Sequence, residues 1–317
     1  MSERITLPQA AELLRNAGEV RILTHQQPDG DAIGSSCGLA ILLQSMGKKA
    51  EICCADPFAA RFSHSTNGVK PQTVSPDAFL VTVDLADPQL AGSKYAALAE
   101  KADLAIDHHA THTDYAAKVY LEGEAPAACE LLAELVRELN VPLTRDLANC
   151  IYTGICTDTG CFKYSATSAR THRIAADLIE AGADAAEISR LMFDTKSPAR
   201  IMLEQAVMNS ITYSFDGRVA LAVLPEAVLK ESGAEEADIN GLSAMPRQIE
   251  GVELALFLRE IGKDNYKISA RSGELVDASA FCARFGGGGH RRASGCRIAA
   301  DLDTVRRQLL EAAGEVL

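Results

Sequence analysis

The sequence predicts an α/β protein of two domains, an N-terminal domain built on a parallel β-sheet and a smaller C-terminal domain of the α+β class. Three observations predict this fold class. The chain has 317 residues, about twice the length of an average domain. Over its first two-thirds, short apolar runs alternate with helical patterns, as in parallel strands whose connecting helices cover the sheet. After about residue 194 this alternation stops and a β-hairpin signal follows.

The N-terminal domain begins with a strand, a helix and a second strand. Residues Glu19 to His25 form an apolar run of strand length, which we expect to be buried in the sheet. Residues Asp31 to Gly47 have a helical pattern that ends at a glycine, a common helix terminator. Residues Lys49 to Cys54 are predicted to be the next strand.

Two more strands and three more helices complete this domain. The runs Phe79–Asp84 and Asp103–Asp107 are apolar, and each ends in an acid, which predicts buried parallel strands. Residues Ala125–Asn140 carry their leucines on one stripe at helical spacing. Helical patterns also cover Arg145–Thr157 and Ala169–Ala181.

A connector helix is predicted between the domains. Ser197 followed by Pro198 is typical of a helix start, and we place that helix at residues 195–210. We therefore assign residues 1–194 to the first domain and residues 211–317 to the second.

The second domain contains a β-hairpin signal. Ile211–Phe215 and Arg218–Leu224 flank Asp216-Gly217, a pair that favours a tight turn between antiparallel strands. Further strand candidates are Val252–Glu260 and Tyr266–Ala270.

The composition argues against several classes of protein. The net charge of −12 argues against a protein that wraps duplex DNA. The lack of Trp and an aromatic content of 5% argue against a stacking platform for a long single strand. No secretory signal or membrane-spanning segment is visible, and the nine cysteines form no C-x-x-C pair. We therefore expect a cytoplasmic protein with reduced cysteines, with neither duplex DNA nor a membrane as partner.

Acidic and histidine side chains lie where the predicted strands and one helix end, and the carboxyl ends of parallel strands meet at one edge of a sheet. Alone, each of these residues has an ordinary structural explanation, such as a turn, a helix cap or a surface histidine. Together they would repel one another or stay unpaired unless a cation lay between them. Mixed His/Asp ligands suit manganese, iron or zinc, and six or more are enough for two ions acting on a phosphate. The residues concerned are His25, Asp29, Asp31, Asp84, Asp107, His108, His109 and Asp158.

These residues fall in four short motifs, His25-x-x-x-Asp29-x-Asp31, Val83-Asp84, Asp107-His108-His109 and Thr157-Asp158-Thr159. In this order the motifs resemble those of the DHH phosphoesterase superfamily. Residues Phe285 to His290 (FGGGGH) resemble the glycine-rich motif of the DHH-associated domain of the same proteins. Within the superfamily the chain is most similar to the NrnA-like branch, the nanoRNase / pAp phosphatase type of RecJ-like phosphoesterase.

The resemblance implies a role for each residue of the motifs. His109 would face the scissile phosphate. Asp107 would bind no ion and would orient a histidine instead. The cofactor would be two divalent metal ions, with manganese expected. The ligands would be His25 and Asp29 for one ion, Asp31, His108 and Asp158 for the other, and Asp84 as the bridge.

A glycine-rich stretch near the C-terminus lies among basic residues. Gly286 to Gly289 lack side chains and so allow backbone N–H groups to approach an anion, although a glycine run is also typical of a flexible loop. Between Arg259 and Arg297 there are eight Lys or Arg and four acids, a balance that suits capture of a small anion. Ser294 departs from the family, which usually has a second alanine there. The resemblance implies a terminal-phosphate clamp made of Arg271, Ser272, Gly288, Gly289 and His290.

The function implied is a two-metal-dependent phosphoesterase with its active site in the cleft between the domains. Its substrates would be short nucleotides with a terminal phosphate, namely pAp, dinucleotides such as pApA or pGpG, and nanoRNA. The alternatives are a soluble cyclic-dinucleotide (c-di-AMP) phosphodiesterase and a non-catalytic nucleotide-binding sensor. A RecJ-like exonuclease is disfavoured by the short chain, and a family II pyrophosphatase by the missing Ser-Arg-Lys-Lys-type signature. The preferred substrate, the metal, the direction of attack and the oligomeric state stay open, with a homodimer among the options.

Overall fold

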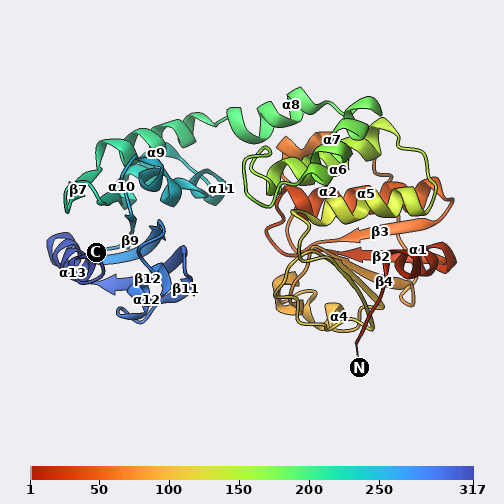
Figure 1. Cartoon of the computed structure of the whole chain (residues 1–317), viewed down its shortest axis with the longest axis horizontal. Coiled ribbons are helices and arrows are strands. Elements are labelled where there is room, and N and C mark those ends of the chain that lie inside the picture. Colours follow the sequence, from red (N-terminus) through yellow and green to blue (C-terminus); the bar gives the residue numbers. More distant parts are fainter. Residues whose placement is uncertain (1) are drawn as a thin grey trace. The chain divides into compact units, whose positions relative to one another are not determined.

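The computed structural model describes residues 2–317, which form two compact units (Figure 1). The first unit ends at Thr195 and the second begins at Lys196. Within the described residues, no helix is both long enough and apolar enough to cross a membrane.

The first unit is built on a six-stranded sheet in which every pairing is parallel, as the sequence predicts. The strand order is β1-β6-β5-β4-β2-β3. Two short strands, β1 and β6, were not predicted. The strands are β1 (Glu3–Arg4), β2 (Glu19–Leu23), β3 (Lys49–Cys53), β4 (Phe79–Val83), β5 (Leu104–Asp107) and β6 (Lys118–Leu121).

Helices cover both faces of this sheet. One face packs in a large apolar core with α1, α2, α5 and α6, and the other packs in a smaller core with η2 and α4. Figure 1 shows α2, α5, α6 and α7 on one side of the strands and α4 on the other. The helices are α1 (Leu7–Asn16), α2 (Gly30–Ser45), α3 (Ser63–Thr66), α4 (Ala96–Ala99), α5 (Ala128–Glu138), α6 (Arg145–Asp158), α7 (Ala169–Glu180) and α8 (Ala185–Ser189), with the short turns η1 (Ala60–Phe62), η2 (Pro88–Ala91) and the π-helical η3 (Arg190–Asp194).

Glycines let α2 and α6 approach one another closely. A Cβ atom added to Gly34 of α2 would lie 2.5 Å from the carbonyl oxygen of Cys150 on α6. A Cβ added to Gly154 of α6 would collide with the sulfur of Cys129 and lie 2.5 Å from Oδ1 of Asp31. Because real Cβ contacts are longer, this packing requires glycine and places the start of α2 against the end of α6.

The second unit has a mixed six-stranded sheet in the order β11-β12-β10-β9-β8-β7. The predicted hairpin is present, because β7 and β8 pair antiparallel around Asp216-Gly217. The strands are β7 (Thr212–Ser214), β8 (Val219–Leu224), β9 (Leu254–Gly262), β10 (Asn265–Ser272), β11 (Gly288–His290) and β12 (Ala293–Ala299).

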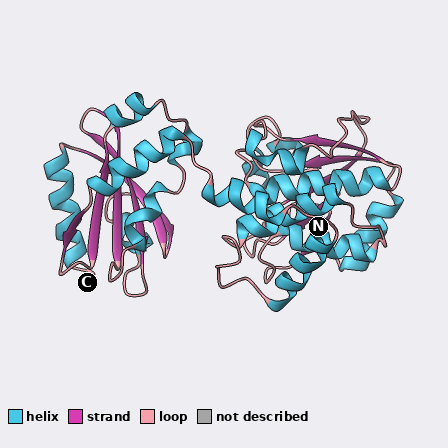
Figure 2. Ribbon diagram, turned by 90° about the horizontal axis from the view of Figure 1, so that it is seen from above, coloured by secondary structure: helices cyan, strands magenta, loops and turns pink. Residues whose placement is uncertain are grey.

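Helices also lie on both faces of the second sheet (Figure 2). One face packs against α12 and α13, and β8 and β9 pack on the other face against α9 and η4. Leu203 and Val207 of α9 are fully buried in this second core, so the helix predicted as a connector packs on the second sheet. The helices are α9 (Pro198–Asn209), α10 (Glu226–Ser232), α11 (Glu236–Ile239), η4 (Leu242–Gln248), α12 (Ala278–Ala283) and α13 (Leu302–Gly314).

Part of the glycine-rich stretch is a strand, so it is not the flexible loop of which a glycine run is also typical. Gly288–His290 form the edge strand β11, paired antiparallel with β12. Gly287 lies so close to β12 that an added Cβ would be 2.5 Å from Cβ of Cys296. Gly287 and Gly289 therefore allow close backbone approach to β12, whereas a Cβ added to Gly288 would meet no atom within 4 Å.

Candidate metal centre

The candidate site lies at the carboxyl ends of β2, β4 and β5. From β2 the chain continues to β3 at one edge of the sheet and then returns to form β4 on the other side of β2. Open α/β sheets bind ligands at such a reversal, because the loops that follow the two strands leave in opposite directions. His25 follows β2 and Asp84 follows β4, so both residues lie at this reversal.

His25 directs its Nε2 atom into the site. Its Nδ1 atom lies 2.8 Å from the carbonyl oxygen of Gln26, so Nδ1 donates that hydrogen bond and Nε2 is left for a ligand. Nε2 lies 3.8 Å from Oδ1 of Asp29 and 3.7 Å from Oδ2 of Asp84. Burial lowers the pKa of His25, but the two carboxylates outweigh burial and raise the pKa to about 11. The surroundings of Nε2 therefore attract positive charge.

Asp29 and Asp31 are held by the first turns of two helices. Asp29 caps α2, and its Oδ1 accepts two backbone N–H groups at 3.0 Å each. Asp31 is fully buried and accepts the N–H groups of Ala128 (2.6 Å) and Cys129 (2.9 Å) at the start of α5. Burial and the neighbouring carboxylates raise the pKa of Asp31 to about 7. The cap of α2 is thus Asp29, and Asp31 is free to serve the site.

Asp84 lies at the centre of the site. Its φ of 52° is left-handed, a conformation that Asp adopts more readily than most residues, and it follows β4 directly. Only 3% of the residue is exposed. Oδ2 lies 3.7 Å from Nε2 of His25, whereas Oδ1 lies 3.5 Å from Nε2 of His108. Burial would raise the pKa of Asp84, but the imidazoles of His108 and His25 hold it below its usual range.

His108 and Asp158 form the second half of the site with Asp31. His108 Nδ1 lies 3.1 Å from the carbonyl oxygen of Ala125, and its Nε2 lies 3.8 Å from Asp31 Oδ2 and 3.6 Å from Asp158 Oδ2. Burial lowers the pKa of His108, but Asp84 and Asp31 outweigh burial and raise it to about 10. Burial and the other carboxylates raise the pKa of Asp158 to about 9.

The donor atoms are close enough to hold metal ions. Within residues 2–317, the ligand atoms of each of three groups lie within 4.8 Å of one another. Asp84 Oδ1 and His108 Nε2 are buried without a hydrogen-bond partner among the described residues, which is unfavourable unless a cation satisfies them. The three groups are His25, Asp29 and Asp84; Asp31, His108 and Asp158; and Asp84, Asp107, His108 and His109.

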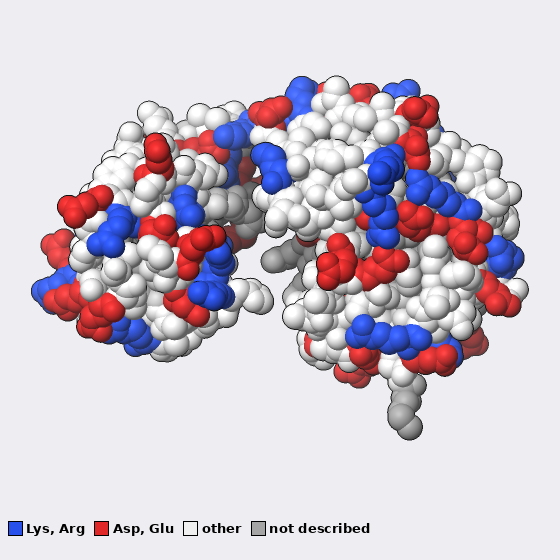
Figure 3. All heavy atoms as spheres, in the orientation of Figure 1, with Lys and Arg blue, Asp and Glu red and all other residues white. Residues whose placement is uncertain are grey.

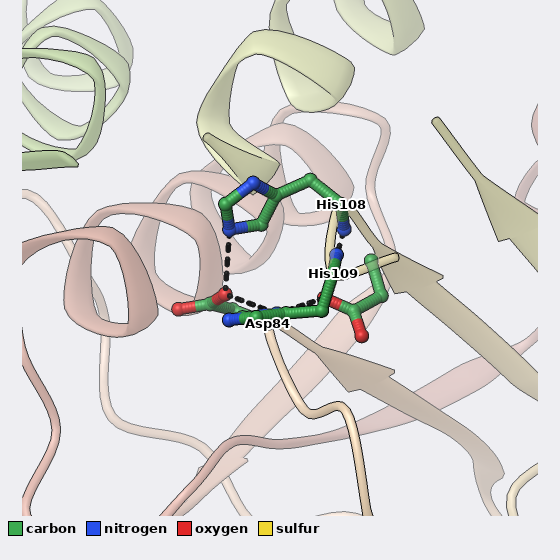
Figure 4. Close-up of side chains that lie close together, drawn as sticks. Asp84, His108 and His109 are labelled. Atoms are coloured by element: carbon green, nitrogen blue, oxygen red, sulfur yellow. Dashed lines mark hydrogen bonds and ion pairs between the residues drawn. The ribbon is translucent and has the colours of Figure 1, made fainter. Parts of the chain in front are cut away.

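His109 is oriented by Asp107. Its Nδ1 atom lies 2.8 Å from Oδ1 of Asp107, the buried last residue of β5, and 3.6 Å from Oδ1 of Asp84. Figure 4 shows the rings of His108 and His109 approaching Asp84 from different directions. The hydrogen bond to Asp107 raises the pKa of His109 against the effect of burial. The side chain of His109 is 42% exposed, so its Nε2 is accessible to a ligand.

A cavity of about 270 Å³ opens onto this cluster. Its charged lining residues were predicted from the sequence, but its uncharged ones were not, because uncharged loop side chains give no signal of their own. Their position directly after β2 and β4 is the signal that points to them. The uncharged lining residues are Gln26, Gln27, Ala86 and Leu90.

Arg271 and His290 lie on one face of the second sheet. Arg271 pairs with Ala293 between β10 and β12, and Ala293 pairs with His290 between β12 and β11. Directly paired residues point to the same face, so Arg271 and His290 flank Ala293 with Cα atoms about 10 Å apart. Gly288 and Gly289 precede His290 on the same edge strand.

Ser272 points away from this face, unlike the other predicted clamp residues. Successive strand residues face opposite sides of a sheet, and Ser272 directly follows Arg271. Its side chain is buried, and its hydroxyl donates to the carbonyl oxygen of Arg291 at 3.1 Å. The geometry therefore gives Ser272 a structural contact and does not support its assignment to the clamp.

A cavity of about 200 Å³ in the second unit is lined by Arg271 and further basic residues. Arg259 also lines it but is neutralised by Glu236, through two hydrogen bonds of 2.9 and 3.1 Å. Lys267 and Arg271 form no ion pair with any residue between 2 and 317. Phe257 provides a buried apolar surface. The cavity therefore keeps positive charge available for an anion.

Comparison with known proteins identifies the family of the chain. Residues 19–155 match the N-terminal domain of the DHH family, and residues 216–317 match the DHHA1 domain. The chain is also 34% identical, over 97% of its length and 93% of the relative's, to the bifunctional oligoribonuclease and PAP phosphatase NrnA of Thermus thermophilus. The chain belongs to the DHH family.

Solved structures share the DHH-family fold. A crystal structure of an exopolyphosphatase-related protein from Bacteroides fragilis has a TM-score of 0.84 at 24% identity, covering 98% of this chain and 95% of that one. A crystal structure of the exonuclease RecJ bound to manganese has a TM-score of 0.52 at 15% identity, covering 96% and 92%. The family assignment and the His/Asp cluster together make this DHH-family chain a phosphoester hydrolase.

Proposed function

We propose that the chain is a two-metal phosphoesterase that hydrolyses short nucleotides with a terminal phosphate, namely pAp, dinucleotides such as pApA and pGpG, and nanoRNA. One observation carries the proposal. The two oxygens of Asp84 face two different imidazoles, those of His25 and His108. The carboxylate of Asp29 also faces His25, and that of Asp158 also faces His108. A shared carboxylate between two sets of donors is the arrangement of a two-metal phosphoryl-transfer site. The name of the Thermus relative, an oligoribonuclease and PAP phosphatase, supports the class of substrate.

The donor set favours two divalent ions, with manganese expected because it accepts mixed imidazole and carboxylate ligands. When bound, such ions would lower the pKa of a water molecule and neutralise charge on the phosphoryl oxygens. The backbone holds several donors in place before any ion binds, since Asp31 is anchored by N–H groups of α5 and His108 by the carbonyl of Ala125. The proposed ligands are His25 and Asp29 for one ion, Asp31, His108 and Asp158 for the other, and Asp84 for both.

His109 is proposed to act on the substrate rather than to bind an ion. Asp107 accepts a hydrogen bond from its Nδ1, which leaves Nε2 accessible in the cavity. A protonated ring in this position would stabilise negative charge on the phosphoryl group or donate a proton to the leaving oxygen. Asp107 favours the protonated ring, as the raised pKa of His109 indicates.

The second unit is proposed to bind the terminal phosphate of the substrate. Arg271, Gly288, Gly289 and His290 form the clamp, because Arg271 and His290 share a sheet face and the glycines leave the edge strand accessible. The cavity beside Arg271 also contains the unpaired Lys267. On the face visible in Figure 3, acidic and basic side chains are interspersed over each unit, which suits a small substrate better than duplex DNA. The cytoplasmic location and the oligomeric state expected from the sequence remain predictions.

A substrate panel with manganese tests the proposal. We expect turnover of pAp and dinucleotides, and lower rates per end as the chain lengthens to about ten nucleotides, because few aromatic residues are present to hold a long strand. His108→Ala should lose activity on every substrate, whereas the control Asp77→Asn removes an exposed carboxylate outside the cluster and should not. Equal rates on a dinucleotide and a twenty-mer would indicate a RecJ-like exonuclease. Binding of nucleotides without turnover would indicate a sensor.

A further inference from the structure

His112 is a buried histidine outside the DHH-family motifs. It lies between β5 and β6, and its side chain has no exposed surface. The backbone N–H of Asp114 donates to its Nδ1 atom at 3.0 Å. Nδ1 therefore acts as an acceptor, and a neutral ring carries its proton on Nε2. Burial lowers the pKa of His112 and outweighs the opposing effect of Asp107 and Asp114, which favours the neutral ring.

The Nε2 atom of His112 faces the carboxylate of Asp107. Nε2 and Oδ2 of Asp107 are 4.0 Å apart. Both atoms are buried, and neither has a hydrogen-bond partner among the described residues. The separation exceeds hydrogen-bond length, and a movement of about 1 Å would bring the two atoms to an ordinary hydrogen-bond distance. The Nε2–H group of His112 and the Oδ2 atom of Asp107 are therefore a matched donor and acceptor.

The other oxygen of Asp107 is already occupied. Oδ1 accepts the backbone N–H of His108 at 2.8 Å and Nδ1 of His109 at 2.8 Å. Oδ1 also accepts the backbone N–H of His109 at 3.4 Å, so every donor lies on one oxygen and none holds Oδ2. A donor on Oδ2 would fix the plane of the carboxylate and hence the direction of the His109 ring.

The ring of His112 is itself held from two sides. Tyr115 stacks on it with ring centroids 5.0 Å apart and an interplanar angle of 28°. The Tyr115 hydroxyl lies 2.7 Å from Oγ1 of Thr82 and 2.9 Å from the carbonyl oxygen of Leu85, which flank Asp84 in the chain. Asp114, whose backbone N–H donates to the ring, has its carboxylate held by Arg4 through two hydrogen bonds of 3.0 Å each. The position of His112 is therefore tied to the end of β4.

We propose that His112 is a positioning residue that donates its Nε2–H to Asp107 and thereby holds His109 in its working orientation. This role rests on the proposed function, because it matters only if His109 acts on the substrate. The cavity at the metal site is not lined by His112, whose side chain lies within ion-pair distance of Asp107 and Asp114.

Two matched variants distinguish the roles of the two nitrogen atoms of His112. His112→Gln places an amide N–H close to the position of Nε2, whereas His112→Asn keeps only an acceptor near Nδ1 for the Asp114 N–H. We expect His112→Asn to lower kcat on a dinucleotide by about 10- to 100-fold, the usual effect of removing an outer-shell partner. KM and the number of bound manganese ions should stay unchanged, and His112→Gln should recover most of the rate. Equal rates in the two variants would overturn the proposal.

The protonation state of His112 tests the proposal without any activity. Long-range ¹H–¹⁵N spectra of the metal-free wild-type protein should show a neutral His112 ring with its proton on Nε2. That proton should exchange slowly, and Asp107→Asn should change its chemical shift. A neutral ring protonated on Nδ1 has no Nε2–H to donate and would exclude the proposed hydrogen bond even if the enzyme is fully active. Conversely, the expected spectrum with no turnover of any nucleotide would contradict the proposed function and leave the hydrogen bond established.

Discussion

At the scale of single residues, the site depends on how each donor is presented. Asp84 leaves β4 in a left-handed conformation that places its carboxylate between His25 and His108. Both histidines use Nδ1 to bond a backbone carbonyl and so present Nε2 to the site. Asp31 and Asp29 are fixed by backbone N–H groups at helix starts. The donors are therefore fixed by the backbone independently of one another.

Asp84→Ala should abolish turnover of every substrate and reduce manganese binding to fewer than two ions per chain. The reason is that Asp84 is the donor shared by both halves of the site, so its loss weakens both. Because changes to outer-shell partners alone cost about 10- to 100-fold, a loss above 100-fold is expected here. Metal content and steady-state rates measure the effect, with Asp77→Asn as the control. Two tightly bound ions and wild-type rates in the variant would show that Asp84 is not shared.

The pKa shifts predict how manganese and protons compete. In the metal-free protein, the pKa values of Asp31 (about 7) and Asp158 (about 9) are raised above their ordinary values, and so are those of His108 (about 10) and His25 (about 11). Raised values mean that folding favours the protonated forms, so the metal-free protein should lose stability as pH rises from about 5 to 9. Asp84 has the opposite shift, but its contribution is lost only in acid, below this window.

Manganese requires neutral imidazoles and ionised carboxylates, so its binding should release protons and strengthen with pH. The increase in Tm caused by manganese over EDTA should therefore grow from pH 5.5 to pH 8.5. Calorimetry in buffers of different ionisation enthalpy would count the protons released per ion. A manganese-dependent Tm increase that stays constant over this range would contradict the predicted linkage.

At the scale of elements, much of the site could be predicted from the sequence because parallel strands bring their carboxyl ends together. The buried strands β2, β4 and β5 and the helix α6 were found within one or two residues, and each ends next to a motif. The strands β1 and β6 were missed because each is short and gives too little pattern. β11 was missed because glycine has no strand preference, and only its pairing with β12 makes it a strand.

Other parts of the site depend on contacts that no local pattern carries. Ser272 was assigned to the clamp with Arg271, although neighbouring strand residues face opposite sides. The side of the sheet to which each residue of β10 points could be assigned only once the pairing of β10 with β9 and β12 was known. The sequence did not indicate a role for His112 either, because its contact with Asp107 depends on the path of the loop after β5.

Gly154→Ala tests the packing of α2 against α6. The new Cβ would meet Cys129 and lie 2.5 Å from Oδ1 of Asp31, so the helices must separate or Asp31 must move. Overpacking of this kind costs about 1–3 kcal/mol, and urea unfolding of the metal-free protein would measure it. Manganese affinity should fall as well, because Asp31 is a proposed ligand. Gly18→Ala is the control, since no atom lies within 4 Å of its added Cβ. Equal stability and affinity in both variants would show that the packing is not constrained at Gly154.

At the scale of the whole molecule, the two units carry different chemistry. The His/Asp cluster lies entirely within the first unit, and the unpaired Arg271 and Lys267 lie in the second. The roles proposed for the two units, bond cleavage and recognition of a remote phosphate, can therefore be tested separately by mutation. Binding energy from a remote group can be used to align the reacting phosphate, so its loss can lower kcat as well as raise KM.

Arg271→Ala and His290→Ala should impair hydrolysis of pApA and pAp but largely spare a small activated diester such as bis-p-nitrophenyl phosphate. A charge-assisted contact with phosphate contributes about 1.5–3 kcal/mol, which corresponds to roughly 10- to 150-fold in kcat/KM. The diester has no second phosphate, so it loses no contact in either variant. Arg292→Ala is the matched control, because it removes an exposed arginine from the turn between β11 and β12. If both kinds of substrate lose activity in parallel while metal content is unchanged, the clamp assignment is wrong and His290 belongs with the reacting groups.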